Sequence, residues 1–156
     1  AAEHAMQRTE VVMAVTGHLE KDHRLVNYAA SLVQPGGSLC LAHVECRQTF
    51  DRYLEAISKI PTIDTDDARS RLEEQLLKDA RAYVDSCAAR LARSALDLQV
   101  KALVDFGDHL NDYRQYMERF SVDLLVMNTK DEDQLAMHGL AYPLAVELRQ
   151  IPLVML

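Results

Sequence analysis

The chain has 156 residues, of which 49% are hydrophobic and 26% are charged, and its formal net charge is −7. This size and composition fit one globular domain. The acidic balance, without a cluster of Lys and Arg, excludes nucleic acid and anionic membrane surfaces as the main partner, and no apolar run approaches the roughly 20 residues that cross a bilayer.

The amino-terminal part predicts a short lead-in followed by a strand. Residues 1–9 lack an apolar pattern, so we expect them to be a disordered lead-in or the remnant of a tag, with one domain over residues 10–156. The apolar run Val11–Val15 predicts the first strand. We expect Gly17 to give the freedom that a tight turn requires, and Asp22 to cap the next helix.

The next segment predicts a helix, a strand and a second, shorter helix. One apolar helical face is formed by Leu25, Tyr28, Ala29, Leu32 and Val33. Pro35, Gly36 and Gly37 end this helix, and Ser38–Glu45 reads as the second strand. Apolar residues from Phe50 to Ile57 then indicate a short helix.

The middle of the chain predicts a long helix, a strand and a third helical face. Asp64, Asp66 and Asp67 suit the start of a helix that extends to Leu91. Alternation over residues 98–104 predicts the third strand, and residues 105–108 predict a turn in which Asp108 caps the following helix. That helix has an apolar face formed by Leu110, Tyr113, Tyr116, Met117 and Phe120.

The last part completes an alternating pattern of strands and helices. We expect a buried strand at Asp123–Met127, a helix from about Tyr142 to Gln150, and an edge strand at Leu153–Leu156. Right-handed connections then give an α/β fold: a single-domain, Rossmann-like three-layer sandwich with a five-stranded parallel sheet and helices on both faces.

Both ends of the chain resemble a known family. With VVMAVTGH near the start and DFGDHL…VDLLVMN…HGLAYPLAVELRQIPLVML at the end, the chain is similar to the universal stress proteins. These proteins share an adenine-nucleotide-binding-like α/β domain, and the pattern matches over nearly the whole chain. The resemblance implies a stress-response or regulatory role and a fold in which the loop after the fourth strand can hold a nucleotide.

The nucleotide motif of the family is altered in this chain. Members that bind ATP carry Gly-x2-Gly-x9-Gly-Ser/Thr after the fourth strand. Here Asn128 and Asp131 stand in the first two glycine places, and Gly139 in the third is followed by Leu140 after a spacer of only seven residues. Thr16 replaces the acidic residue that commonly ends the first strand.

The charge of this loop also opposes phosphate binding. A phosphate about 6 Å from one carboxylate meets a repulsion of roughly 1–3 kcal/mol, and residues 131–133 supply three carboxylates. Unless Lys130 or Mg²⁺ compensates, phosphate binding in the usual manner of the family is disfavoured. We therefore expect no cofactor, with an adenine nucleotide as the alternative.

Any ligand pocket is expected where the first and fourth strands adjoin. Its predicted lining is Thr16, Gly17, His18, Val44, Asn128, Thr129, Lys130 and Gly139. Two readings stay open: a pocket for a small ligand, or ordinary turn chemistry at a vestigial site.

Metal binding and catalysis are not predicted. Asp131, Glu132 and Asp133 with His138 lack the spacing of a calcium loop, so we expect no metal. His43 reads as a hydrogen-bonded core residue. No nucleophile–base pair or phosphate cradle is evident, so we expect no enzyme and no catalytic residue.

The terminal strand is the expected contact surface. An uncovered edge at Leu153–Leu156 invites pairing with a second copy, and the resemblance implies dimerisation through the same element. Cys40, Cys46 and Cys87 form no CxxC pair and suit a reducing, cytoplasmic compartment. The predicted function is a non-enzymatic regulatory or stress-response domain that acts through dimerisation and an unknown protein partner. The alternative is a sensor of AMP, ATP or a cyclic dinucleotide, including one fused to a membrane transporter.

Overall fold

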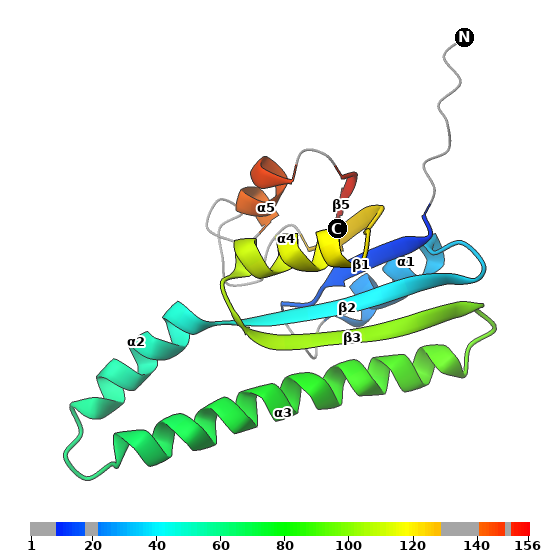
Figure 1. Cartoon of the computed structure of the whole chain (residues 1–156). Helices are drawn as coiled ribbons and strands as arrows, with labels where there is room; N and C mark the ends of the chain where they lie inside the picture. The colour runs from blue at the N-terminus through cyan, green and yellow to red at the C-terminus, as the bar shows by residue number, and fades with distance from the viewer. Residues whose placement is uncertain (1–8, 18–21, 129–140, 149–150) are drawn as a thin grey trace.

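The computed structural model describes residues 9–17, 22–128, 141–148 and 151–156 (Figure 1). In chain order the elements are β1 (Val11–Val15), α1 (His23–Leu32), β2 (Gly37–Cys46), α2 (Arg47–Ser58), α3 (Thr65–Ala92), β3 (Leu98–Gly107), α4 (His109–Arg119), β4 (Leu124–Met127), α5 (Ala141–Glu147) and β5 (Leu153–Met155). The predicted lead-in, apart from Thr9, lies outside the described residues.

The five strands form one parallel sheet in the order β3-β2-β1-β4-β5. Strand β1 lies at its centre, where Met13 pairs with Cys40 on one side and Leu125 on the other. Strand β5 lies at one edge. The predicted α/β fold and the adjacency of the first and fourth strands are confirmed.

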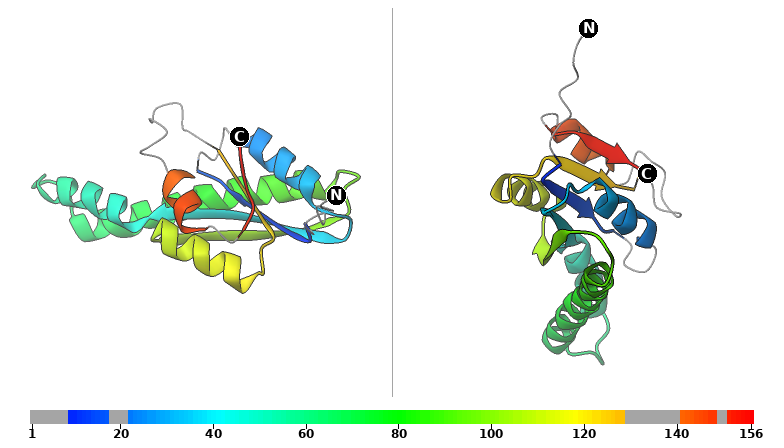
Figure 2. Two further views of the ribbon diagram at one scale, coloured as in Figure 1. Left: turned by 90° about the horizontal axis from the view of Figure 1, so that it is seen from above. Right: turned by 90° about the vertical axis from the view of Figure 1, so that its right-hand side faces the viewer.

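Two helical layers cover the two faces of the sheet (Figure 2). Successive side chains on a strand point to opposite faces, so Val12 and Ala14 pack with α1 and α3, while Met13 and Val15 pack with α4 and α5. The interiors of strands β1 and β4 are buried on both faces of the sheet, as their continuous apolar sequences predict. The three-layer sandwich is confirmed.

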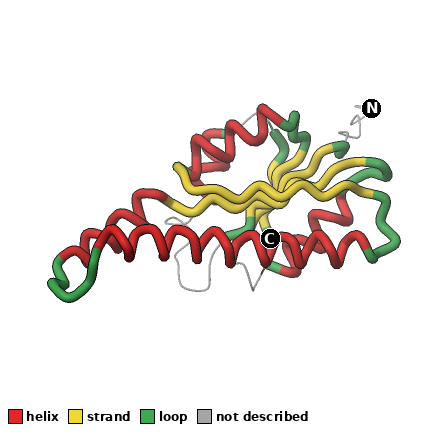
Figure 3. The backbone as a smooth tube through the Cα atoms, turned by 60° about the horizontal axis from the view of Figure 1, so that its bottom comes forward, coloured by secondary structure: helices red, strands yellow, loops and turns green. Residues whose placement is uncertain are grey.

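Helix α2 and the first part of α3 extend beyond the sheet (Figures 1 and 3). We call α2 together with residues 59–77 the α2–α3 arm. A small apolar cluster joins it to the sheet, in which Phe50 and Leu54 of α2 pack against Phe106 of β3. Tyr53 on this arm is 66% exposed.

The turn predicted at residues 105–108 is wrong. Strand β3 continues to Gly107 in register with Cys46 of β2. Phe106, which the sequence placed in the turn, contacts the Phe50 ring at 5.1 Å and so ties β3 to the α2–α3 arm. The apolar contact favours extended strand over a turn at this point.

Two of the three predicted helix caps are confirmed. Asp64 accepts hydrogen bonds from two backbone N–H groups of α3, and Asp108 accepts one from Asn111 in α4. Asp22 stands at the predicted N-cap position of α1, but the side-chain cap expected there is wrong, because its carboxylate makes no capping bond to the helix. Helix α5 ends at Glu147, because Leu148 already lies outside the helix, so it is shorter than predicted; Gln150, the predicted end, lies outside the described residues.

The turn after β1 does not require a glycine. A Cβ at Gly17 would meet nothing within 4 Å, and its φ is not positive. Two of the described glycines are needed by the backbone: Gly36, with φ of +80°, and Gly37, where a Cβ would come within 2.6 Å of the Glu10 carbonyl oxygen.

Among the helices in the described ranges, none is both long and apolar enough to cross a membrane.

Candidate functional site

The carboxyl ends of β1, β2 and β4 meet at the centre of the sheet. The chain adds β2 and β3 on one side of β1 and then β4 and β5 on the other, so the order of strands reverses between β1 and β4. Ligands of open α/β sheets bind at the carboxyl end beside such a reversal. Thr16, Val44 and Asn128 of the predicted site lie at this end.

Thr16 directs its polar groups into the sheet. It is fully buried, and both its backbone N–H and its Oγ1 donate to the carbonyl oxygen of Ala42, at 2.9 Å and 3.1 Å. The Thr16 hydroxyl, which was expected to lie beside a ligand, therefore joins the end of β1 to β2 by a hydrogen bond.

Strands β1 and β2 separate immediately after this contact. In a regular parallel ladder the Val44 N–H would next donate to the Thr16 carbonyl. Instead it donates to Tyr113 Oη at 3.0 Å, and the Thr16 carbonyl accepts from His43 Nδ1 at 2.6 Å. We call this place, formed by Thr16, His43 and Val44, the β1–β2 split.

Two side chains of α4 seal Val44, which means that they hydrogen-bond to its backbone N–H and carbonyl groups. Beside the bond to Tyr113, His109 Nε2 donates to the Val44 carbonyl at 2.7 Å, and the two rings stack with centroids 5.9 Å apart. Burial raises the pKa of Tyr113 above its ordinary range, although the hydrogen bond with Val44 acts in the opposite sense, so the phenol stays neutral. Val44 thus presents no open backbone edge to a ligand.

His43 carries a second contact on the other side of its ring. Its Nε2 lies 2.7 Å from Glu45 Oε1, and the imidazole is buried. Burial lowers the pKa of His43, but the hydrogen bonds to Glu45 and Thr16 and the charges of Glu45 and Asp22 outweigh it, so the pKa lies above its ordinary value. The predicted hydrogen-bonded core histidine is confirmed.

Asn128 joins the end of β4 to the start of α1. Its side-chain amide donates to Asp22 Oδ1 at 2.7 Å, and Asp22 is 1% exposed. This contact explains why Asp22 does not cap α1, since its carboxylate turns toward β4. A buried carboxylate therefore lies beside Asn128, the residue expected to stand in the first glycine place of the family motif.

Several predicted site residues cannot be placed. His18, Thr129, Lys130 and Gly139 lie outside the described residues, as do the acidic residues 131–133 and His138. The described part brings together Thr16, Val44 and Asn128, with Gly17 exposed at the turn. Within that part, no group of three or more His, Cys, Asp or Glu side chains could hold a metal ion.

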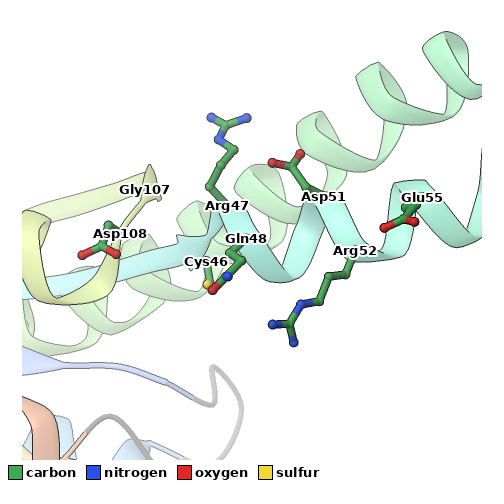
Figure 4. A pocket seen from close by; sticks show the side chains of 8 residues that line it. All are labelled: Cys46, Arg47, Gln48, Asp51, Arg52, Glu55, Gly107 and Asp108. Atoms are coloured by element: carbon green, nitrogen blue, oxygen red, sulfur yellow. The ribbon is translucent and has the colours of Figure 1, made fainter.

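A separate open hollow lies where α2 leaves the sheet (Figure 4). Its volume is about 520 Å³, and its lining is Cys46, Arg47, Gln48, Asp51, Arg52, Glu55, Gly107 and Asp108. The two arginines point to opposite sides of α2, and Arg47 is engaged with the Phe106 ring and with Glu73. The side chains do not converge on one point in the hollow.

Sequence reasoning missed the groups that fill the β1–β2 split. Tyr113 was expected to belong to a plain apolar face, and His109 received no role. A usable signal was their spacing of four residues, which places both on one side of α4. Another was Glu45 two residues after His43, which puts both on the same face of β2.

The fold of this chain is that of the universal stress proteins. UspA from Lactobacillus plantarum superposes with a TM-score of 0.72 at 14% identity, over 96% of this chain and 98% of that one. The hypothetical protein MJ0577 gives 0.73 at 13%, covering 95% of both chains. A universal stress protein in complex with cAMP gives 0.54 at 13%, over 96% and 97%. No protein-family model and no curated protein matches the sequence.

Proposed function

We propose that this chain is a non-enzymatic regulatory or stress-response domain of the universal stress type, in which the usual ATP binding of the family is lost. The observation that carries the proposal is the sealing of Val44 by Tyr113 and His109. A ligand that needed this strand edge would have to break one buried and one partly buried hydrogen bond. Leaving such groups unpaired costs about 1–3 kcal/mol each.

Electrostatics supports the same function. The buried Asp22 carboxylate lies against Asn128, where an ATP-binding loop would begin. A phosphate about 6 Å from this charge would meet a repulsion of roughly 1–3 kcal/mol. This charge adds to those of residues 131–133, so the departures from the phosphate motif act together.

Calorimetry tests the loss of ATP binding. We expect no saturable heat when the chain is titrated with ATP, with or without Mg²⁺. The Tyr113→Phe variant, which unseals the Val44 N–H, is titrated in parallel, with Tyr116→Phe on the same helix as the matched control. A micromolar Kd, which corresponds to about −8 kcal/mol, for ATP and the unaltered chain would overturn the proposal.

The partner proposed for the terminal edge is a second copy of the chain. Strand β5 pairs with β4 on one side only, and Met155 and Leu156 at its end are 50% and 41% exposed. An edge strand with exposed apolar groups is suited to pairing with its own copy across a two-fold axis. The dimer would then present a surface to a further protein partner in the cytoplasm.

Light scattering tests this dimer. Val154→Asp is expected to give a monomer, and Met155→Asp, at a more exposed position, gives the same result without burying a charge against α1. Tyr53→Asp on the α2–α3 arm is the control that keeps the dimer. Dimers in both β5 variants would remove the terminal strand from the interface.

The second candidate function is a nucleotide sensor, alone or as the cytoplasmic regulatory domain of a membrane transporter. Its support is the similarity to a universal stress protein in complex with cAMP. Cyclic AMP and cyclic dinucleotides carry less phosphate charge than ATP, so Asp22 opposes them less. Calorimetry with cAMP, AMP and a cyclic dinucleotide separates this candidate from the first. If one binds, Lys130→Ala should weaken it, and an unchanged affinity would place the pocket elsewhere.

A further inference from the structure

The His43 ring bridges the two strands at the β1–β2 split. Nδ1 lies 2.6 Å from the Thr16 carbonyl oxygen of the β1 side, and Nε2 lies 2.7 Å from Glu45 Oε1 on β2. His43 is 5% exposed, so its ring is largely shielded from water. Glu45 is more accessible, with 27% of its side chain exposed.

Both nitrogens of this ring face acceptors. A carbonyl oxygen can only accept, so Nδ1 carries a proton. A neutral imidazole has one N–H, and its other nitrogen would then face an ionised carboxylate at 2.7 Å with no proton between them. The geometry therefore needs one more proton, shared between Nε2 and Glu45.

The surrounding elements place other ionisable groups near this proton. Asp22, before α1, adds a negative charge that favours protonation of the ring. On α3, burial raises the pKa of the Tyr83 phenol, and the charge of Asp22 acts in the same direction, so the phenol stays neutral. Arg90 of α3 contacts His23 at 3.0 Å. Opposite His43, β3 presents the apolar Val104.

We propose that His43 and Glu45 form a proton-dependent clamp that fixes the His43 ring against the Thr16 carbonyl at the β1–β2 split, so that pH acts on the turn at Thr16 and Gly17. With the proton present, the clamp ties the Thr16 carbonyl through the ring to Glu45. When the proton leaves, Nε2 and Oε1 both become acceptors and repel each other. Glu45, which reaches water, then turns away, and the ring keeps only the Thr16 contact.

The clamp is a property of the unliganded chain. The clamp can exist whether or not the proposed function is correct. Only the idea that the clamp regulates the candidate site rests on the proposed function. Neither calorimetry with nucleotides nor the oligomeric state reports on it, so failure of the clamp and failure of the proposed function are measured separately.

Histidine side-chain NMR over pH 5–9 tests the clamp, with the His43 signal assigned by its loss in His43→Gln. We expect a midpoint above the ordinary value of about 6.5, with the backbone amides of Thr16, Gly17 and Val44 shifting at the same midpoint. Glu45→Gln is expected to lower the His43 midpoint by roughly one pH unit, a tenfold loss of proton affinity. Glu55→Gln, which removes an exposed carboxylate on α2, is the matched control and leaves the midpoint unchanged.

Three results would overturn the clamp. The first is a His43 midpoint at or below the ordinary value in the unaltered chain. The second is equal midpoints in Glu45→Gln and Glu55→Gln. If Glu45→Gln fails to fold, the ¹⁵N shifts of the unaltered ring decide: two N–H shifts near neutral pH support the clamp, and one bare nitrogen overturns it.

Discussion

The β1–β2 split and the α2–α3 arm both lie at the carboxyl end of the sheet, yet they are held by opposite kinds of contact. At the split, buried bonds join residues far apart in sequence, such as Tyr113 to Val44 over 69 positions. On the arm, exposed ion pairs link residues within one helix, such as Arg71 to Asp67 over four positions, or the two helices of the arm, such as Arg69 to Asp51 over 18. The comparison shows that long-range hydrogen bonds fix the carboxyl end of the sheet at the split. The arm, in contrast, is held mostly by contacts within and between its own helices.

The largest expected effect comes from the core of the sheet. Leu39→Ala removes a fully buried side chain from the α1/α3 face and should cost about 2–5 kcal/mol of unfolding free energy. Leu54→Ala on the arm removes an equally large, buried group from a small cluster that can collapse, so its cost should be lower. Urea unfolding of both variants measures the difference. An equal or greater loss for Leu54→Ala would show that the arm is as tightly held as the sheet.

The second effect concerns the seal on Val44. Tyr113→Phe leaves the buried Val44 N–H without its acceptor and should cost about 1–3 kcal/mol. Tyr116→Phe, on the same helix but only half-buried, should stay within about 0.5 kcal/mol of the unaltered chain. The same urea midpoints compare the two. Similar losses would mean that the Tyr113 hydroxyl does not stabilise the split.

The third effect is a pH dependence located at the split. The pKa of His43 is raised in the folded chain, so its stabilising contribution is complete below its ordinary value of 6.5 and is lost as pH rises through the folded pKa. The urea midpoint should therefore fall with rising pH over this window more steeply in the unaltered chain than in His43→Gln. Parallel curves for the two proteins would contradict this assignment.

The smallest effect is expected on the arm. Arg71→Ala breaks an i,i+4 ion pair with Asp67 whose side chains are 79% and 57% exposed, and should cost no more than about 0.5 kcal/mol. The small loss should also shrink in high salt, because exposed pairs are screened. A loss comparable to that of Tyr113→Phe would remove the contrast between the two regions.

The layers of the fold were predictable because local patterns carry them. Continuous apolar runs at Val11–Val15 and in β4 predicted strands buried on both faces, and the acidic start at Asp64 predicted the cap of α3. The end of β3 was not predictable in the same way. Residues 105–108 have a turn-like composition, and only the tertiary contact of Phe106 with Phe50 keeps the strand extended.

The site was less predictable, because its geometry rests on distant pairs. The sequence indicated Thr16, Val44 and Asn128 individually, but not that Asn128 meets Asp22 across 106 positions or that His109 meets Val44 across 65. Asp22 was expected to cap α1 because carboxylates suit that position. A hydrogen bond to Asn128 from another element took its side chain instead, and no local pattern signals such a choice.

The central place of β1 also sets an order of assembly. During synthesis β1 can pair with β2 as soon as residue 46 is made, but its other edge waits for β4, about 80 residues later in the chain. Through that interval an apolar strand edge stays open to wrong pairing, which is the hazard of parallel sheets with distant partners. The second edge of β1 is therefore covered only when β4 arrives, and β5 then completes the sheet against β4.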